Sequence, residues 1–274
     1  MKRILFPTDF SNTSRKALTY ALEIARRNNA ELILTHTIED IYEFTPMIED
    51  YKQRMTREVE IQLQNLIDEI TIKEEYQNLD VKTQILNGRI VTTILEKADQ
   101  VKADLIVMGT TGATGLKKIF FGSNATEVML KSAIPVLAVP EGSSFDGLKH
   151  ITFFTDYHDG DKKALNKITE LGKLFDSEIT IVHIEEEHNF TNEIMRRGFK
   201  EMVAEQISIA ADFEFITAES FLSGVSKFLD NNPSSLLTMV RYKKPFFTEL
   251  FHKDHSKEMT FYSNIPLLIL EGKK

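Results

Sequence analysis

The feature that most constrains this chain is an internal repeat. Residues 2–39 align without a gap against residues 149–186, and residues 108–137 align against residues 239–268. Two blocks that recur in the same order indicate a duplicated domain. Matched residues are separated by fewer positions in the second block than in the first, so we expect the second copy to be shorter between its second and fourth strands. A chain of 274 residues has room for two such cores.

The identities between the copies fall at the start of a strand and in the loop that follows it. The matched residues are Ile4, Phe6, Thr8 and Asp9 in the first copy and Ile151, Phe153, Thr155 and Asp156 in the second. The segment Glu141–Gly147 is rich in Gly and Ser, as linkers often are. The predicted domains are therefore residues 1–141 and 148–274.

Short apolar runs alternate with helical spacing along the first copy. The expected strands are Ile4–Phe6, Leu32–Leu34, Val81–Leu86, Leu105–Met108 and Val136–Val139. Apolar residues at helical spacing lie between them, and Ser11 or Asn12 can cap the first helix. Strands that are apolar on both faces and alternate with helices predict an α/β fold, in which helices cover both sides of a parallel sheet. We therefore expect two tandem doubly wound domains.

Two loops of the first copy carry the chemistry of a phosphate site. Ligands of open parallel sheets bind beyond the carboxyl ends of the strands, where this sequence places Pro7–Asp9 and Gly109–Gly112. Glycine tolerates positive φ and has no Cβ, so Gly109, Gly112 and Gly122 would let main-chain N–H groups approach a polyphosphate. Ser123 and Asn124 then lie at a helix N-terminus, which favours anions.

A simpler interpretation of the same residues stays open. Gly109 and Gly112 would merely turn the chain, and Asp9 would cap the helix that begins near Ser11. Asp9 is poorly suited to meet phosphate, but its carboxylate can accept hydrogen bonds from ribose hydroxyls.

Several segments together resemble the universal stress protein family. They are Ile4–Asp9, Leu34–Ile38, Val107–Gly112, Gly122–Ala125 and Ile134–Val139. The resemblance extends over nearly the whole chain, and it is weaker in the second copy. It implies a five-stranded parallel sheet in the order 3-2-1-4-5 in each domain, which would bring Asp9 close to Gly109.

The resemblance also implies a ligand, ATP, with any Mg²⁺ carried by the nucleotide. Asp9 would meet the ribose, the main chain at Thr37 the adenine, and Met108 and Gly109 the nucleoside. The residues expected to hold the nucleotide are Pro7, Thr8, Asp9, Thr37, Met108, Gly109, Gly112, Gly122, Ser123 and Asn124. Family members that bind ATP often have Thr or Ser where this chain has Ala125, and losing a hydrogen bond to a charged group would weaken binding at least about tenfold.

The second copy lacks the glycine motif. The alignment places Val240, Lys243 and Lys253 where the first copy has Gly109, Gly112 and Gly122, and it replaces Ser123 with Asp254. We therefore predict that the second domain does not bind ATP. Its Asp156 is expected to cap a helix.

Other candidate sites are weak. His252 and His255 have a spacing that a metal could use, but no third ligand is evident, so no metal site is predicted. His36 and His183 end matched strands and are expected to serve packing or turn geometry. An aromatic cluster is either a partner surface or a filling for the second domain's empty cleft; it comprises Tyr242, Phe246, Phe247 and Phe251.

The sequence favours a non-enzymatic, ATP-binding stress-response protein that contacts a protein partner. No P-loop lysine and no nucleophile paired with a base is evident, so no catalytic residue is predicted, although slow ATP hydrolysis stays open. The alternative is a scaffold protein of the same fold without nucleotide. An enzyme that acts on a nucleotide or a phosphorylated substrate is the least favoured of the three.

Charge and composition narrow the partners and the location. A net charge of -8 opposes binding to nucleic acid or to an anionic membrane. The chain has no cysteine and no apolar leader at its start, so we expect a cytoplasmic protein. The last strands of the two domains, Val136–Val139 and Leu267–Leu270, are expected to pair as a pseudo-dimer within the chain, and the tandem chain could form a homodimer.

Overall fold

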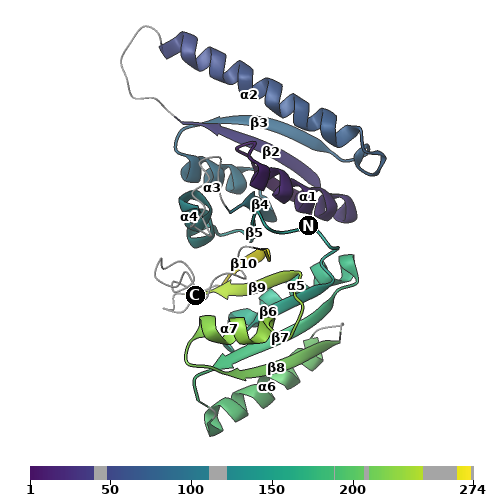
Figure 1. Cartoon of the computed structure of the whole chain (residues 1–274), viewed down its shortest axis with the longest axis vertical. Helices are drawn as coiled ribbons and strands as arrows, with labels where there is room; N and C mark the ends of the chain where they lie inside the picture. The colour runs from purple at the N-terminus through teal and green to yellow at the C-terminus, as the bar shows by residue number, and fades with distance from the viewer. Residues whose placement is uncertain (40–47, 111–121, 188, 207–209, 243–263, 273–274) are drawn as a thin grey trace. The chain divides into compact units, whose positions relative to one another are not determined.

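The computed structural model describes residues 1–39, 48–110, 122–187, 189–206, 210–242 and 264–272. They form two compact units, the first ending at Glu141 and the second beginning at Gly142. Figure 1 shows helices packed against strands in each unit. Each unit is considered by itself below.

Unit one is a parallel sheet with helices on both faces. Its strands are β1 (Arg3–Pro7), β2 (Glu31–Ile38), β3 (Val81–Asn87), β4 (Leu105–Gly109) and β5 (Val136–Val139). Its helices are α1 (Asn12–Asn28), α2 (Ile48–Thr71), the 3₁₀ turn η1 (Glu74–Tyr76), α3 (Ile90–Gln100) and α4 (Ser123–Lys131). The strand order is β3-β2-β1-β4-β5, and every pair is parallel.

Local signals explain where α1 begins and ends. The Ser11 hydroxyl accepts a hydrogen bond from the Ser14 N–H, so Ser11, one of the two caps that the sequence allowed, is the N-cap. Asn29 ends the helix in the left-handed conformation at φ 51°. The helix α1 packs on the same face as α2, to which it is joined by an Arg15–Glu69 ion pair of 2.5 Å, whereas α3 and α4 pack against each other.

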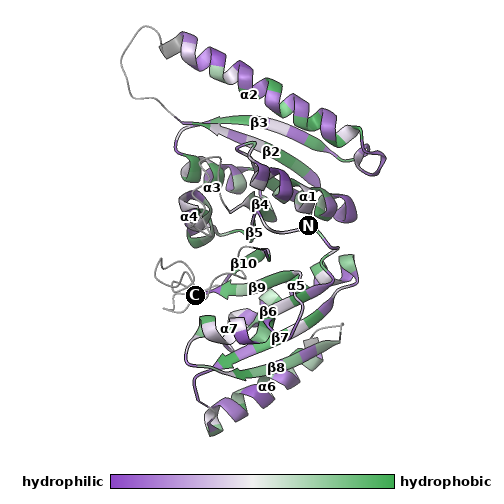
Figure 2. Ribbon diagram, viewed as in Figure 1, coloured by the Kyte–Doolittle hydropathy of each residue, from purple (hydrophilic) through white to green (hydrophobic). Residues whose placement is uncertain are grey.

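The core of unit one is built from β1, β2 and β4. Their central residues are almost entirely buried, as expected for strands covered on both faces. Figure 2 shows hydrophobic residues along the strands and polar residues on the outward side of helices such as α2. The edge strand β3 differs, because Lys82, Thr83 and Gln84 are exposed.

Unit two repeats this plan. Its strands are β6 (His150–Phe154), β7 (Glu178–Glu185), β8 (Ala211–Thr217), β9 (Leu236–Arg241) and β10 (Leu267–Glu271), and its described helices are α5 (Asp159–Phe175), α6 (Phe190–Gln206) and α7 (Phe221–Leu229). The order is β8-β7-β6-β9-β10, again parallel. The predicted fold class, with its order 3-2-1-4-5 in both domains, is confirmed.

The shortening of the second copy lies between its second and third strands. Residues 39–80 separate β2 from β3, but only residues 186–210 separate β7 from β8. The helix in this interval has 24 residues in unit one and 17 in unit two. In contrast, α1 and α5 both have 17 residues, and β2 and β7 both have 8. The first helix and the second strand thus keep their lengths in both units, and the shortening affects the second helix and the loops beside it.

Candidate functional site

Three segments meet at the carboxyl edge of the sheet in unit one. The strand β1 lies between β2 and β4, so the residues that follow it have Thr35–Thr37 on one side and Gly109–Thr110 on the other. The Thr8 N–H donates to the Thr35 carbonyl at 2.8 Å. The Gly122 N–H donates to the Thr110 carbonyl at 2.5 Å, which holds the start of α4 against the end of β4.

The loop after β1 is fixed by a small hydrogen-bonded frame. The buried hydroxyls of Thr8 and Ser14 lie 2.7 Å apart, and the Phe10 N–H donates to the Thr8 hydroxyl at 3.0 Å. The ring nitrogen Nδ1 of His36 donates to the Thr8 carbonyl at 2.8 Å, and the Phe10 ring stacks on His36 with centroids 4.8 Å apart. Phe10 adopts φ 61°, an uncommon conformation for a bulky residue, and the stacking and hydrogen bonds hold it there.

Asp9 stands at the exposed turn of this frame. One of its carboxylate oxygens accepts from the Ser11 N–H at 3.1 Å, while Ser11 itself caps the helix. Asp9 is therefore a turn residue and does not cap α1. Its side chain is exposed at the sheet edge, beside the ends of β2 and β4.

Gly109 ends β4 directly beneath the first turn of α1. A Cβ built there would lie 3.0 Å from the Thr13 Cγ2 atom and 3.2 Å from the Ser14 backbone nitrogen. The positive φ that the sequence argument allowed is not used at Gly109 or Gly122, because the only described glycines with positive φ are Gly88 and Gly147. Gly109 is needed because α1 passes so close to the strand.

The helix α4 begins without a side-chain cap. Its N-cap Gly122 has φ -63° and ψ 156°, a conformation open to any residue. Ser123 and Asn124 form the exposed first turn, and Ala125 behind them is buried. A helix start of this kind offers main-chain N–H groups and a positive dipole end to an anion.

The structure gathers most of the predicted site residues along this edge. Of the ten, nine are described, and they are Pro7, Thr8, Asp9, Thr37, Met108, Gly109, Gly122, Ser123 and Asn124. Gly112 lies outside the described residues, as does the loop between Thr110 and Gly122. Thr8 and Met108 are 7% exposed, so their side chains belong to the core and only their main chains are placed to meet a ligand. The Thr37 hydroxyl lies 3.1 Å from that of Thr93 on α3.

Some residues of the frame were missed by sequence reasoning. Ser14 and Thr110 were not among the predicted site residues, yet Ser14 positions the loop and Thr110 joins β4 to both β5 and α4. The Thr110 side chain is 1% exposed, and its hydroxyl has no hydrogen-bond partner among the described residues. The signal was available for Ser14, because the repeat aligns it with Asp161, a residue of related hydrogen-bonding chemistry.

Unit two contains the corresponding hydrogen-bonded frame after its first strand, β6. The Thr155 hydroxyl donates to Asp161 at 2.6 Å, and His183 Nδ1 lies 2.9 Å from the Thr155 carbonyl. Tyr157 stacks on His183 at 4.0 Å with φ 56°. The prediction that both histidines serve packing and turn geometry agrees with these contacts. Asp156 is not the helix cap, because His158 and Asp161 form the capping box of α5.

Tyr242 fills the edge of unit two. It directly follows β9, and its hydroxyl donates to the fully buried Asp161 at 2.5 Å. A Cβ on Gly160 would lie 2.6 Å from that hydroxyl, and one on Gly272 would clash with the ring. Burial raises the pKa of Asp161, although the hydrogen bonds from Thr155 and Tyr242 oppose this shift.

Val240 is buried where the first copy has Gly109. Phe246, Phe247, Phe251, Lys243, Lys253, Asp254, His252 and His255 lie outside the described residues.

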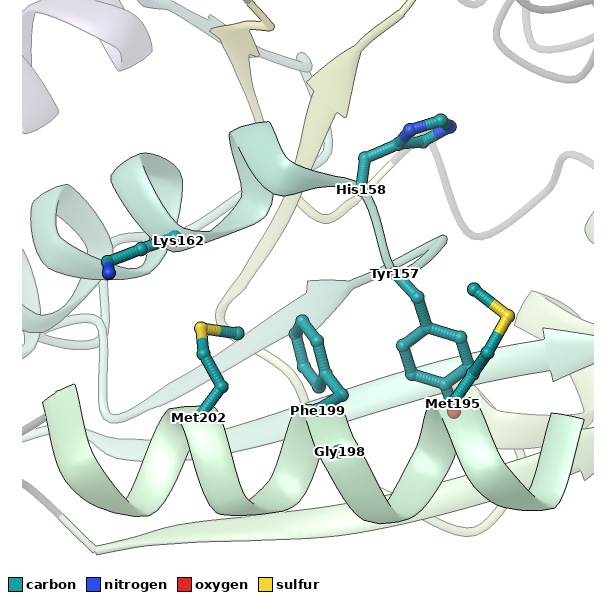
Figure 3. Close-up of a pocket in the computed structure, with 7 residues that line it drawn as sticks. All are labelled: Tyr157, His158, Lys162, Met195, Gly198, Phe199 and Met202. Carbon is teal, nitrogen blue, oxygen red and sulfur yellow. The ribbon is translucent and has the colours of Figure 1, made fainter.

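A separate cavity of about 390 Å³ lies between α5 and α6 of unit two (Figure 3). Met195, Phe199 and Met202 project from α6 toward α5, and Tyr157 and His158 line the cavity from the start of α5. Its lining is mostly methionine and aromatic side chains.

Neither a membrane-spanning helix nor a cluster of metal ligands is present in the part of the chain that the structure describes. No helix among the described residues is long and apolar enough to cross a membrane. No group of three or more His, Cys, Asp or Glu residues within the described ranges could hold a metal ion.

Comparison with known proteins places the fold in a family. The model of the universal stress protein family matches residues 1–140. The universal stress protein MJ0531 of Methanocaldococcus jannaschii is 34% identical over 139 residues, covering 50% of this chain and 81% of its own, and MJ0577 of the same organism is 30% identical over 157 residues, covering 52% and 97%. The crystal structure of a universal stress protein from Archaeoglobus fulgidus covers 99% of this chain and 98% of its own, with a TM-score of 0.72 and 19% identity. The family match spans just over half of the sequence, and the chain therefore belongs to the universal stress protein family.

Proposed function

We propose that the first domain binds an adenine nucleotide, ATP in the first instance, at the carboxyl edge of its sheet. The observation that carries the proposal is the uncapped start of α4 at Gly122, which is hydrogen-bonded to the end of β4 on the edge where Asp9 is exposed. The main-chain N–H groups of the helix start can bind a phosphate chain, and the Asp9 carboxylate can accept hydrogen bonds from a ribose.

Each described residue then has a role that its position permits. Ser123, Asn124 and the N–H groups of the first turn of α4 would hold phosphates, and Gly112 would join them. Asp9 would accept from the ribose hydroxyls. The main chains of Pro7, Thr8, Thr37, Met108 and Gly109 would line the nucleoside, since the side chains of Thr8 and Met108 are already buried. Any Mg²⁺ would arrive with the nucleotide.

We propose that the second domain binds no nucleotide. Tyr242 and its hydrogen bond to Asp161 take the position that follows β9, and Val240 replaces the glycine that ends β4. The domain would instead complete a pseudo-dimer with the first, as the sequence predicts. The whole protein would act in the cytoplasm as a non-enzymatic stress-response protein whose partner contacts depend on nucleotide occupancy.

The test begins with the purified full-length chain. Acid extraction followed by chromatography should release adenine nucleotide, and calorimetry should show saturable ATP binding. A Gly122→Lys variant should lose this binding, because the lysine side chain stands at the helix start while the backbone there tolerates any residue. Gly198→Lys is the matched control, since Gly198 lies in α6 of unit two and a Cβ there meets nothing within 4 Å.

A second candidate function is a scaffold without nucleotide. It is favoured by Ala125, whose buried methyl group stands where family members that bind ATP often have a hydroxyl. Absence of calorimetric heat at millimolar ATP would support the scaffold and overturn the nucleotide proposal. Turnover of ATP well above a protein-free blank would instead require an enzymatic function.

A further inference from the structure

Unit one has a polar cavity of about 490 Å³ at the amino ends of its strands. This is the edge opposite the candidate nucleotide site. Its charged lining residues are four cations and a single carboxylate: Arg3, Lys82, Lys97, Lys102 and Glu31. Such an excess of positive charge is notable in a chain whose net charge is -8.

The carboxylates near the cavity neutralise only part of this charge. Glu31 is shared by Arg3, at 3.0 Å, and Lys82, and Asp80 lies 3.9 Å from Lys82. Where the structure describes the chain, Lys97 donates only to the neutral amide oxygen of Gln100, at 3.2 Å. Within the described part of the chain, the Lys102 side chain makes no ion pair or hydrogen bond. Among the described residues, neither Lys97 nor Lys102 is paired with a carboxylate. The Asp104 carboxylate at this edge accepts instead from the main-chain N–H groups of Lys2 and Arg3.

Lys97 occupies a core position of α3. Its residue is 9% exposed, and it lies on the same helix face as the buried Val91 and Ile94. Burying a cation is unfavourable unless the charge is paired. The amide of Gln100 supplies one acceptor and no opposite charge.

The duplicated domain shows what the fold itself requires at this position. Counting from the start of each helix, Lys97 of α3 corresponds to Phe228 of α7, which is 2% exposed. Asp212 of β8 pairs with β7 as Lys82 of β3 pairs with β2. Pro233 precedes β9 by as many residues as Lys102 precedes β4. The same scaffold therefore folds with an aromatic, an acid and a proline in place of three lysines.

A helix C-terminus attracts cations, and this could account for lysines near the end of α3. It does not require a lysine at this particular position, because α7 has Phe228 there and carries its last-turn lysine one residue earlier, at Lys227. The Val101 carbonyl at the end of α3 already accepts a hydrogen bond from the Arg3 guanidinium, at 2.9 Å. The remaining cations are thus not needed to end the helix.

We propose that this cavity binds a small molecule bearing phosphate groups. Lys97 and Lys102 would supply the charge, with the rim cation Lys82 and the amide of Gln84 adding contacts. Phosphate is favoured over a single carboxylate because several cations converge on the cavity and a multiply charged anion interacts with more of them. The site is independent of the nucleotide site, and no residue is shared between the two.

The test uses inorganic pyrophosphate and ¹⁵N-labelled full-length protein carrying Ser123→Asp, whose carboxylate repels phosphate at the candidate nucleotide site. Titration should shift the amide signals of Ile33, Lys82 and Lys102 saturably. Lys97→Phe, which introduces the residue of the second domain, should weaken pyrophosphate binding at least about tenfold, as expected for a lost charge-assisted hydrogen bond. Lys102→Ala should weaken it in the same direction.

Lys131→Ala is the matched control, since Lys131 is an exposed lysine of α4 paired with Glu127 outside the cavity. It should leave pyrophosphate affinity unchanged. A titration with sodium chloride at equal ionic strength separates binding from screening. Equal affinity in Lys97→Phe and its parent, or the absence of saturable shifts at these amides, would overturn the proposal. The melting temperature of each variant shows whether the fold is kept. If Lys97→Phe does not fold, Lys102→Ala, which alters an exposed side chain, tests the proposal, and unchanged pyrophosphate affinity in that variant would overturn it.

Discussion

The Thr13 Cγ2 atom lies 3.0 Å from the point that a Cβ on Gly109 would occupy. The glycine thus lets α1 pass close to the end of β4. In the second domain the alignment places Gly160 on the helix and Val240 on the strand, so glycine and the larger residue have exchanged elements. Gly160 there lies against Tyr242, since a Cβ built on it would be 2.6 Å from the Tyr242 hydroxyl.

This exchange predicts that Gly109→Val destabilises unit one and that Thr13→Gly compensates. The added side chain overpacks the contact, at a cost of about 1–3 kcal/mol. Thr13→Gly removes the contact with the Thr13 Cγ2 atom but leaves the contacts with the main chain of Thr13 and Ser14, so the compensation is partial. The double variant should be more stable than the sum of the single changes by about 1 kcal/mol. Urea unfolding of the four proteins measures the coupling.

Ala98→Val supplies the comparison, because Ala98 is 1% exposed in α3 and has no contact with Thr13 among those described. Its cost should be unaffected by Thr13→Gly. Strict additivity of Gly109→Val and Thr13→Gly would contradict the packing explanation and return Gly109 to a role in ligand binding alone.

Ala125→Ser should tighten ATP binding by about tenfold if the nucleotide lies at the start of α4, because it restores one hydroxyl that can donate to a charged phosphate. Ala125 is the third residue of the helix and is 3% exposed, so serine adds only one atom at a crowded position. Calorimetry compares it with Ala98→Ser, the same substitution at a buried position away from this edge. An affinity that does not change would mean that this side chain does not reach the phosphates.

The sequence was sufficient to predict the fold because the repeat and the apolar strands are local patterns. All five predicted strands of unit one are present, four of them with both ends within one residue of the prediction, whereas β2 runs four residues beyond its predicted end at Leu34. Ser11, one of the two predicted caps, caps α1. The edge at which the site residues meet also follows from a parallel sheet. The reason for Gly109 could not be predicted, because it depends on how closely a helix crosses a strand distant in sequence.

The contacts within unit two were less accessible to sequence reasoning for a similar reason. Tyr242 was one of four aromatics with two open interpretations, and only its contact with Asp161 shows that it fills the edge. Likewise, Asp156 and His158 compete for the role of helix cap two residues apart, and side-chain geometry decides between them. Lys97 resembles any surface lysine until its burial and its counterpart Phe228 are seen.

A buried carboxylate makes the stability of unit one depend on pH in the acid range. Burial alone would raise the pKa of Glu23, but hydrogen bonds from Arg26 at 2.8 Å and Tyr76 at 2.7 Å hold it below its ordinary value of 4.5. A lowered pKa in the folded state means that the stabilisation is complete above 4.5 and is lost as the pH falls through the folded pKa.

Glu23→Gln should therefore cost stability at neutral pH and progressively less as the solution is acidified. Tyr76→Phe should cost about 1.5–3 kcal/mol at neutral pH, because it removes a hydrogen bond to a charged group. Amide exchange in β2, corrected for the intrinsic rate at each pH, reports on unit one alone. A cost of Glu23→Gln that is the same at all pH values would contradict the assignment.

Asp161 in unit two should show the opposite dependence. Burial raises the pKa of Asp161 above its ordinary value of 3.8, so its protonated form is favoured by folding. The stability it contributes is present below 3.8 and is lost as the pH rises through the folded pKa. Asp161→Asn keeps the shape and cannot ionise, so this variant should gain stability relative to the parent as the pH rises. The Tyr242 hydroxyl donates to the ionised carboxylate. Tyr242→Phe should therefore lower the free energy of unfolding more at about pH 7.5 than at about pH 4. This pH dependence should disappear when Asp161→Asn is also present. Amide exchange in β6 measures both effects. If Tyr242→Phe carries the same cost at both pH values in the parent, Tyr242 acts only by filling space, and its hydroxyl is not what holds the edge of unit two closed.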